Sequence, residues 1–293
     1  MKNLNQLKMS SFFSHKSGVA CLLAYFLLAL PTMGQEVPPE EDHRPARPAF
    51  ESTLLIDNQT TIVPPAKTFQ FDIQHRFGTV ENGFEDLFGM WAPSNIRLGF
   101  SYTILNNVSV GFGTTKNQRL QDFNVKYAIV KQTRSNKAPV SVTYYGNAAL
   151  DTRNDDFFYN SSDRLSYFHQ VIVSRRFNTK FSLQVAPSLS HFNLTESTMD
   201  NDHIAIASAL RYKVSSQSAI LINYDQPITK HDQGNPNPNI SFGFEVATSS
   251  HSFQIFMGNY QALVPQYNNM FNSNDFEDGE FLIGFNITRL WSF

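Results

Sequence analysis

The sequence predicts an all-β fold: a transmembrane, antiparallel, up-and-down β-barrel of about 12 strands. Three observations predict it. Apolar and polar residues alternate with period two over most of the chain, long and short connections alternate between these stretches, and the last residue is the aromatic Phe293. Because successive side chains of a strand point to opposite faces, such alternation gives one face to lipid and one to the interior.

Composition excludes two other classes of protein. The chain has 293 residues, of which 41% are hydrophobic and 16% charged, yet no apolar run after Leu30 approaches the length of a membrane helix, which is roughly 18 to 20 residues. Strands are therefore expected to span the membrane. The net charge is -2, so no basic field suggests a nucleic-acid partner.

The first 34 residues have the features of a cleavable signal peptide. Basic residues precede an apolar run at 19–30, and the small residues Thr32 and Gly34 occupy the -3 and -1 positions of a cleavage after Gly34. We therefore expect an exported protein, located in the cell outer membrane. The only cysteine is Cys21, so the exported chain would form no disulfide and no cysteine-ligated metal site.

Residues 35–67 are expected to form a periplasmic tether and lead-in, followed by the barrel at 68–293. Residues 36–48 are rich in Pro, Glu, Asp and Arg, a composition that does not support a packed core. A short extended stretch follows at 53–63. Whether this lead-in enters the barrel is left open.

The strands begin with Phe69, Phe71 and Ile73 on an apolar face and Gln70 and Asp72 on a polar one. The same alternation predicts eleven further strands, with apolar sets at 96–104, 108–112, 123–129, 140–144, 165–173, 181–189, 204–212, 220–224, 240–246, 253–257 and 281–287. The strands beginning at 165 and 219 are the least regular, because Phe168, Ile172 and Leu221 would point inward.

Connection lengths support the same fold, because barrels of this kind have short turns on one side of the membrane and long loops on the other. The long segments fall at 78–94, 114–121, 151–163, 193–202, 226–239 and 261–279, and the short ones at 105–107, 133–138, 177–180, 214–217 and 249–251. An even number of strands then places both chain ends on the short-turn, periplasmic side.

Part of the chain resembles a known family. Residues 71–78 (Phe-Asp-Ile-Gln-His-Arg-Phe-Gly), 95–102 and 108–113, with a lead-in at 55–60, are similar to segments of an uncharacterised outer-membrane barrel family of Bacteroidota, a domain of unknown function. The resemblance implies the fold and the location and no activity. The terminal Phe293 also resembles the signal by which such barrels engage their assembly machinery. The expected partners are that machinery, the lipid of the outer membrane and a periplasmic partner of the tether.

No enzyme, cofactor or metal site is expected. The adjacent pair His251 and Ser252 falls in a predicted turn, whereas His75 and Arg76 fall on opposite faces of one strand and cannot act together. The acidic loops at 151–163 and 272–280 lack the spacing of a calcium-binding loop.

The inward-facing residues are mostly small or neutral, and their charges are mixed in sign, which predicts little ion selectivity. The expected pore-lining residues are Gln70, Asp72, Arg97, Ser101, Lys126, Thr143, Gln184, Arg211 and Glu245. A barrel wider than about eight strands with such a lining must hold water, a loop or a plug. Alternatively, the charges pair with one another and close the interior.

The long loop at 78–94 is unusually apolar. Phe84, Leu87, Phe88 and Trp91 could fold inward as a constriction or contact a ligand; otherwise they pack at the lipid rim or on neighbouring loops. The leading hypothesis is a porin-like passive or narrow channel for small hydrophilic solutes. The alternatives are a non-conducting scaffold or binding protein, a barrel enzyme, and a secreted soluble β-sandwich.

Overall fold

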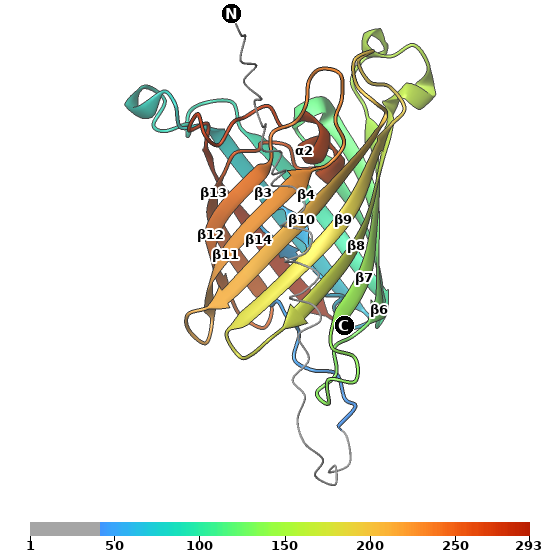
Figure 1. Cartoon of the computed structure of the whole chain (residues 1–293), viewed down its shortest axis with the longest axis vertical. Helices are drawn as coiled ribbons and strands as arrows, with labels where there is room; N and C mark the ends of the chain where they lie inside the picture. Colours follow the sequence, from blue (N-terminus) through green and yellow to red (C-terminus); the bar gives the residue numbers. More distant parts are fainter. Residues whose placement is uncertain (1–41) are drawn as a thin grey trace, which may run out of the picture. The chain divides into compact units, whose positions relative to one another are not determined.

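The computed structural model describes residues 42–293, so the expected signal peptide lies outside the described residues. Twelve antiparallel strands, β3 to β14, pair in chain order, and the barrel closes where β14 pairs with β3 (Figure 1). They are β3 (Thr68–Thr79), β4 (Asn95–Leu105), β5 (Val108–Thr115), β6 (Leu120–Val130), β7 (Ser141–Asp151), β8 (Leu165–Arg176), β9 (Phe181–Phe192), β10 (Asp202–Lys213), β11 (Ser218–Pro227), β12 (Asn239–Ala247), β13 (His251–Gly258) and β14 (Leu282–Ser292). The predicted fold class is confirmed.

The wall of the barrel has apolar side chains outside and polar side chains inside. On β13, Ile255 is 60% exposed whereas its neighbour Gln254 is 4% exposed, and the same alternation runs along most strands. The exposed outer set includes Phe100, Ile104, Val110, Phe123, Ile129, Val171, Ile204, Ile220, Phe242, Phe244 and Phe253. This distribution is the inverse of that in a water-soluble protein and is the one that a lipid environment requires.

The two ends of the barrel differ in their connections. We call the end with residues 106–107, 131–140, 177–180, 214–217 and 248–250 the short-turn end, and the end with residues 80–94, 116–119, 152–164, 193–201, 228–238 and 259–281 the long-loop end. The long loops carry four 3-10 helices, Gly83–Glu85, Asn117–Arg119, Asp155–Phe157 and Ser161–Arg164. The predicted alternation of connections is present, although the 131–140 turn exceeds the 116–119 connection. No helix within residues 42–293 is both long and apolar enough to cross a membrane.

A hairpin that precedes the barrel strands lies inside the barrel. It consists of residues 50–63, which we call the lumen hairpin, and contains the paired strands β1 (Leu54–Leu55) and β2 (Asn58–Gln59). Both of its stems are at the short-turn end: Pro45 bridges to Thr133 before it, and the Lys67 amide donates to the Thr103 carbonyl after it. The expected lead-in is thus partly inside the barrel rather than wholly a periplasmic tether.

A second element enters from the long-loop end. The loop 259–281 between β13 and β14 contains the short helix α2 (Pro265–Phe271), which we call with its loop the lumen loop. Val264, Gln266 and Met270 are fully buried. The lumen loop meets the lumen hairpin where Asn268 Nδ2 donates to Asp57 Oδ2 over 2.5 Å. The lumen is therefore filled from both ends.

Candidate functional site

Side chains of the barrel wall hold the lumen hairpin by its backbone. Six wall side chains donate to its carbonyls: Lys126 Nζ to Thr53 (2.9 Å), Gln254 Nε2 to Leu54 (2.9 Å), Asn223 Nδ2 to Leu55 (2.7 Å), Asn286 Nδ2 to Ile56 (2.6 Å), Gln184 Nε2 to Gln59 (2.7 Å) and Thr143 Oγ1 to Thr61 (3.0 Å). These donors come from six different strands. They add side-chain partners to backbone carbonyls of the hairpin, which are costly to bury unpaired. The Thr53 carbonyl also accepts from the Thr60 amide within the hairpin.

An apolar cluster fixes the hairpin against one side of the wall. Its members are Ala49, Phe50, Leu55, Ile56, Ala209, Ala219, Leu221, Phe256 and Tyr260. Leu221 is one of the apolar residues that the alternation predicted to point inward. It belongs to the same cluster as the hairpin residues Phe50, Leu55 and Ile56. The alanines of β10 and β11 leave room for the larger hairpin side chains.

Arg76 lies at the tip of the hairpin and is fully buried. Its guanidinium donates to Asn286 Oδ1 (3.0 Å) and to the Ile56 carbonyl (3.3 Å), lies 3.7 Å from an oxygen of Asp57, and sits 4.4 Å from the centre of the Phe256 ring. Burial raises the pKa of the Asp57 carboxyl, while the Arg76 charge and the hydrogen bond from Asn268 oppose that rise. His75 is on the other face, stacked on Phe285.

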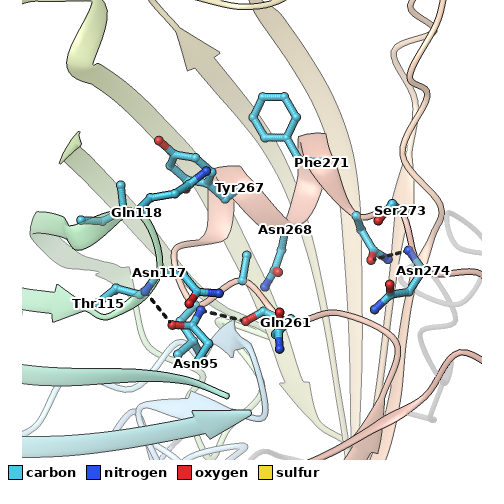
Figure 2. Close-up of a pocket in the computed structure, with 14 residues that line it drawn as sticks. Asn95, Thr115, Asn117, Gln118, Gln261, Tyr267, Asn268, Phe271, Ser273 and Asn274 are labelled. Atoms are coloured by element: carbon cyan, nitrogen blue, oxygen red, sulfur yellow. Dashed lines mark hydrogen bonds between the residues drawn. The ribbon is translucent and has the colours of Figure 1, made fainter. Parts of the chain in front are cut away.

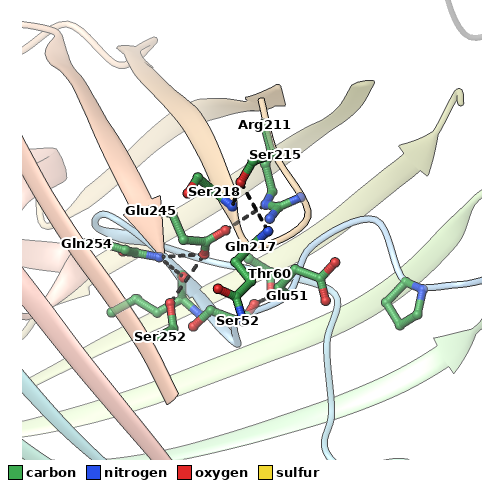
Figure 3. A network of polar contacts seen from close by, with 12 residues as sticks. Glu51, Ser52, Thr60, Arg211, Ser215, Gln217, Ser218, Glu245, Ser252 and Gln254 are labelled. Carbon is green, nitrogen blue, oxygen red and sulfur yellow. Dashed lines mark hydrogen bonds and ion pairs between the residues drawn. The ribbon is translucent and has the colours of Figure 1, made fainter. Parts of the chain in front are cut away.

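Two ion pairs neutralise predicted pore-lining charges. Arg97 donates two 2.8 Å hydrogen bonds to Asp122, and a Cβ atom at Gly113 would lie only 2.2 Å from Arg97 Nη2, so this glycine makes room for the guanidinium. Arg211 donates to Glu245 over 2.7 Å; the same carboxylate accepts from Ser252 and Gln254 (Figure 3). Arg97, Arg211 and Glu245 are thus engaged with neighbours inside the wall.

The remaining predicted lining residues also face the interior. Gln70 exchanges hydrogen bonds with Thr53 of the hairpin. Asp72 and Ser101 line a cavity of about 30 Å³ between hairpin and wall. Asp72 accepts hydrogen bonds from Gln70. The role of all these residues as the lining of an open pore stays a prediction.

The apolar loop at 80–94 does not constrict the barrel. Phe84 is 83% and Trp91 73% exposed, and the loop projects away from the wall (Figure 1). Phe88 packs on Phe84, with ring centres 4.9 Å apart, and Leu87 and Phe88 both adopt positive φ in a tight turn. This loop therefore forms no constriction in the structure, where the lumen hairpin and the lumen loop fill the interior instead. Ligand contact by this loop stays a prediction.

Sequence reasoning missed the residues that close the long-loop end. Gln266 Nε2 donates to Asn147 Oδ1 (3.1 Å) and Ser166 Oγ (3.2 Å), and Asn269 Nδ2 donates to Ser188 Oγ (3.2 Å). The available signal was the density of amide side chains between 259 and 274. Amides suit a polar lumen because each offers both donors and an acceptor.

Fold and site together define a membrane-bound β-barrel whose lumen is filled by its own chain. The protein belongs to the family described as "Membrane bound beta barrel domain (DUF5777)", whose model matches residues 50–291. The match begins at the first residue of the lumen hairpin, so the hairpin is part of the family's domain.

Several solved porins and channels have a similar fold. The KdgM porin is 8% identical, with 77% of this chain and 99% of that chain covered and a TM-score of 0.45. The NanC porin is 11% identical, with 77% of this chain and 99% of that chain covered and a TM-score of 0.49. The COG4313 outer membrane channel from Pseudomonas putida F1 is 12% identical, with 87% of this chain and 100% of that chain covered and a TM-score of 0.44. These likenesses are of fold alone. No curated protein matches the sequence.

Proposed function

We propose that the protein is a channel for small hydrophilic solutes that is closed at rest by the lumen hairpin and opens when the hairpin leaves the lumen. The observation that carries the proposal is the hairpin itself, bonded to six strands around the wall. The hairpin occupies the interior through which a solute would have to diffuse.

The inner face of the wall is polar. This favours a lumen that fills with water when the hairpin leaves, rather than one that stays packed permanently. Lys126, buried, donates to a neutral carbonyl of the hairpin, and Thr143, Gln184 and Asn223 do the same. A permanent interior would gain more from apolar side chains than from buried charges and amides. Water can replace a carbonyl as the partner of these donors, so the wall remains solvated once the hairpin departs.

The proposal includes the location and the partners. We propose that the barrel lies in the outer membrane of a bacterium, with a source among Bacteroidota, and that its short-turn end faces the periplasm. Phe293, 84% exposed at that end, would be available to the assembly machinery. Residues 42–46 pair with the 131–140 turn through backbone hydrogen bonds, so a periplasmic partner that pulls on the hairpin would have to release this pairing. No enzymatic step is part of the proposal.

A reversible disulfide tests the proposal directly. The hydroxyl oxygens of Thr61 and Ser174 are 2.6 Å apart, so the two side chains point toward each other, as a disulfide pair must. The variant Thr61→Cys/Ser174→Cys is made in a chain with Cys21→Ser and purified from membranes into planar bilayers. We expect no current when oxidised, and current steps after reduction under applied voltage or when residues 50–63 are replaced by a flexible linker. The Cys21→Ser chain alone is the matched control.

A non-conducting binding protein is the second candidate. The observation that favours it is the lumen loop, which is bonded directly to the wall at the long-loop end and would retain these bonds if the hairpin left. If the hairpin replacement folds into a barrel that stays electrically silent, the channel proposal fails and this second function takes its place.

A further inference from the structure

A pocket of about 390 Å³ lies at the long-loop end beside α2 (Figure 2). Three segments form it: the junction of β4 and β5 at Asn95 and Thr115, the connection between β5 and β6, and the lumen loop. Its volume falls near the lower end of the range for small-molecule sites, about 300 to 1,000 Å³. The pocket is distinct from the hairpin's own contacts with the wall.

The lining of this pocket is neutral and rich in amides. None of its fourteen lining residues is charged, and seven carry amide side chains: Asn95, Asn117, Gln118, Gln261, Asn268, Asn272 and Asn274. Tyr267 and Phe271 add two aromatic rings from one side of α2 (Figure 2). The pocket therefore offers many donors and acceptors and an apolar surface, but no charge to pair with an ion.

Two buried polar atoms of the lining lack a partner within residues 42–293. Thr115 is 3% and Asn268 1% exposed, yet Thr115 Oγ1 and Asn268 Oδ1 accept or donate no hydrogen bond. The Asn268 amide cannot simply turn away, because its Nδ2 is held by Asp57. A buried polar group without a partner is costly, and both residues are part of the pocket's lining.

The rim is formed by residues that are free to reach such an occupant. Asn117 is exposed and Gln118 half-buried, and across the described chain neither side chain has a hydrogen-bond partner. Gln118 has φ 56° and the next residue, Arg119, φ 50°. Successive positive φ values at non-glycine residues are strained and cluster at binding sites, and here they turn the connection so that Gln118 lines the pocket.

We propose that this pocket binds a neutral sugar, of one or two rings. Each sugar hydroxyl both donates and accepts, as the amide side chain does, and the apolar face of a sugar ring packs on aromatic side chains such as Tyr267 and Phe271. An anionic sugar would bury its charge without a cation, which is unfavourable. The inference goes beyond the proposed function and holds whether or not the barrel conducts.

Isothermal titration of the full chain, purified from membranes in detergent, tests the proposal. The neutral probes are maltose, lactose and chitobiose, and the anionic probe is digalacturonate. We expect saturable binding of at least one neutral disaccharide, with digalacturonate at least about ten-fold weaker. The double variant Asn117→Ala/Gln118→Ala removes two hydrogen bonds at the rim and should weaken binding about ten-fold.

The matched control is Asn154→Ala, which removes an exposed amide from another long loop, outside the pocket. It should leave the affinity unchanged. Absence of saturable binding for all three neutral probes, equal binding of digalacturonate, or unaltered affinity in the double variant would each overturn the proposal. Sugar binding by a barrel that never conducts would support this inference while refuting the channel.

Discussion

The lumen hairpin and the lumen loop fill the same space from opposite ends, but the wall holds them differently. It grips the hairpin by its backbone carbonyls, from six strands, and by an apolar cluster. It holds the loop mainly through side chains: Gln266 and Asn269 donate to β7, β8 and β9. A smaller apolar cluster of Val264 with Leu120 and Ala149 adds to these contacts. The wall thus holds the hairpin by its backbone and a large apolar cluster, whereas it holds the loop by amide side chains and a small one.

The largest effect is expected where charge anchors the hairpin. Arg76→Met would leave Asp57 buried without its cation and remove a donor to the Ile56 carbonyl. We expect a loss of about 3 to 5 kcal/mol in the free energy of unfolding, measured by urea titration in detergent micelles. Adding Asp57→Asn should restore part of it, because the uncompensated charge is removed. An unchanged urea midpoint in the single variant would contradict the importance of this anchor.

The apolar cluster should contribute slightly less. Leu55→Ala leaves a cavity where a fully buried side chain meets Leu221 and Phe256. The expected cost is about 2 to 5 kcal/mol, and it should appear as faster amide hydrogen exchange in residues 50–63. Ile104→Ala, which truncates an exposed outward side chain, is the control. Equal exchange in both variants would show that the cluster does not hold the hairpin.

The lumen loop should respond locally and more weakly. Gln266→Leu removes the donor to Asn147 and Ser166 and leaves their oxygens buried. We expect about 1 to 3 kcal/mol, seen as faster exchange at 259–281 with residues 50–63 unaffected. If protection is lost in both segments together, the two elements are one cooperative unit and the comparison between them fails.

The smallest effect is expected at the loop 80–94. Trp91→Ser replaces a side chain that is 73% exposed, and exposed substitutions of this kind change stability by less than about 0.5 kcal/mol. Adding Trp91→Ser to the variant in which residues 50–63 are replaced should also leave the current through that variant unchanged. A larger current on adding Trp91→Ser would restore the idea that this loop constricts the barrel.

Two patterns in the sequence predicted the barrel. Strand periodicity follows from one face of each strand meeting lipid, and the order of long and short connections follows from the difference between the two ends of the barrel. The filled lumen left a subtler trace. Phe168, Ile172 and Leu221 broke the alternation by pointing inward, and all three are buried there. Leu221 belongs to the cluster that holds the hairpin, whereas Phe168 and Ile172 pack with Tyr145, Ala186 and Ala207 of the neighbouring strands. Inward apolar residues therefore indicate a packed interior, but they do not say which segment fills it.

The site was harder to predict for a physical reason. Aromatic content drew attention to Phe84 and Trp91. The interior is instead bonded by amides such as Gln266, whose partners lie on strands 100 and 119 residues earlier in the chain. Arg76 was assigned to the correct face, but its partner Asp57 lies in a segment whose composition suggested only a lead-in. Long-range pairs of this kind are not visible in local periodicity.

Both stems of the lumen hairpin leave through the same end of the barrel. The segment therefore occupies the interior as a folded-back loop, with both of its stems on one side of the ring that β14 completes with β3. The withdrawal that we propose would follow the same path and would not require the seam to open. Strand pairing would then keep the barrel intact whether the hairpin is inside or outside.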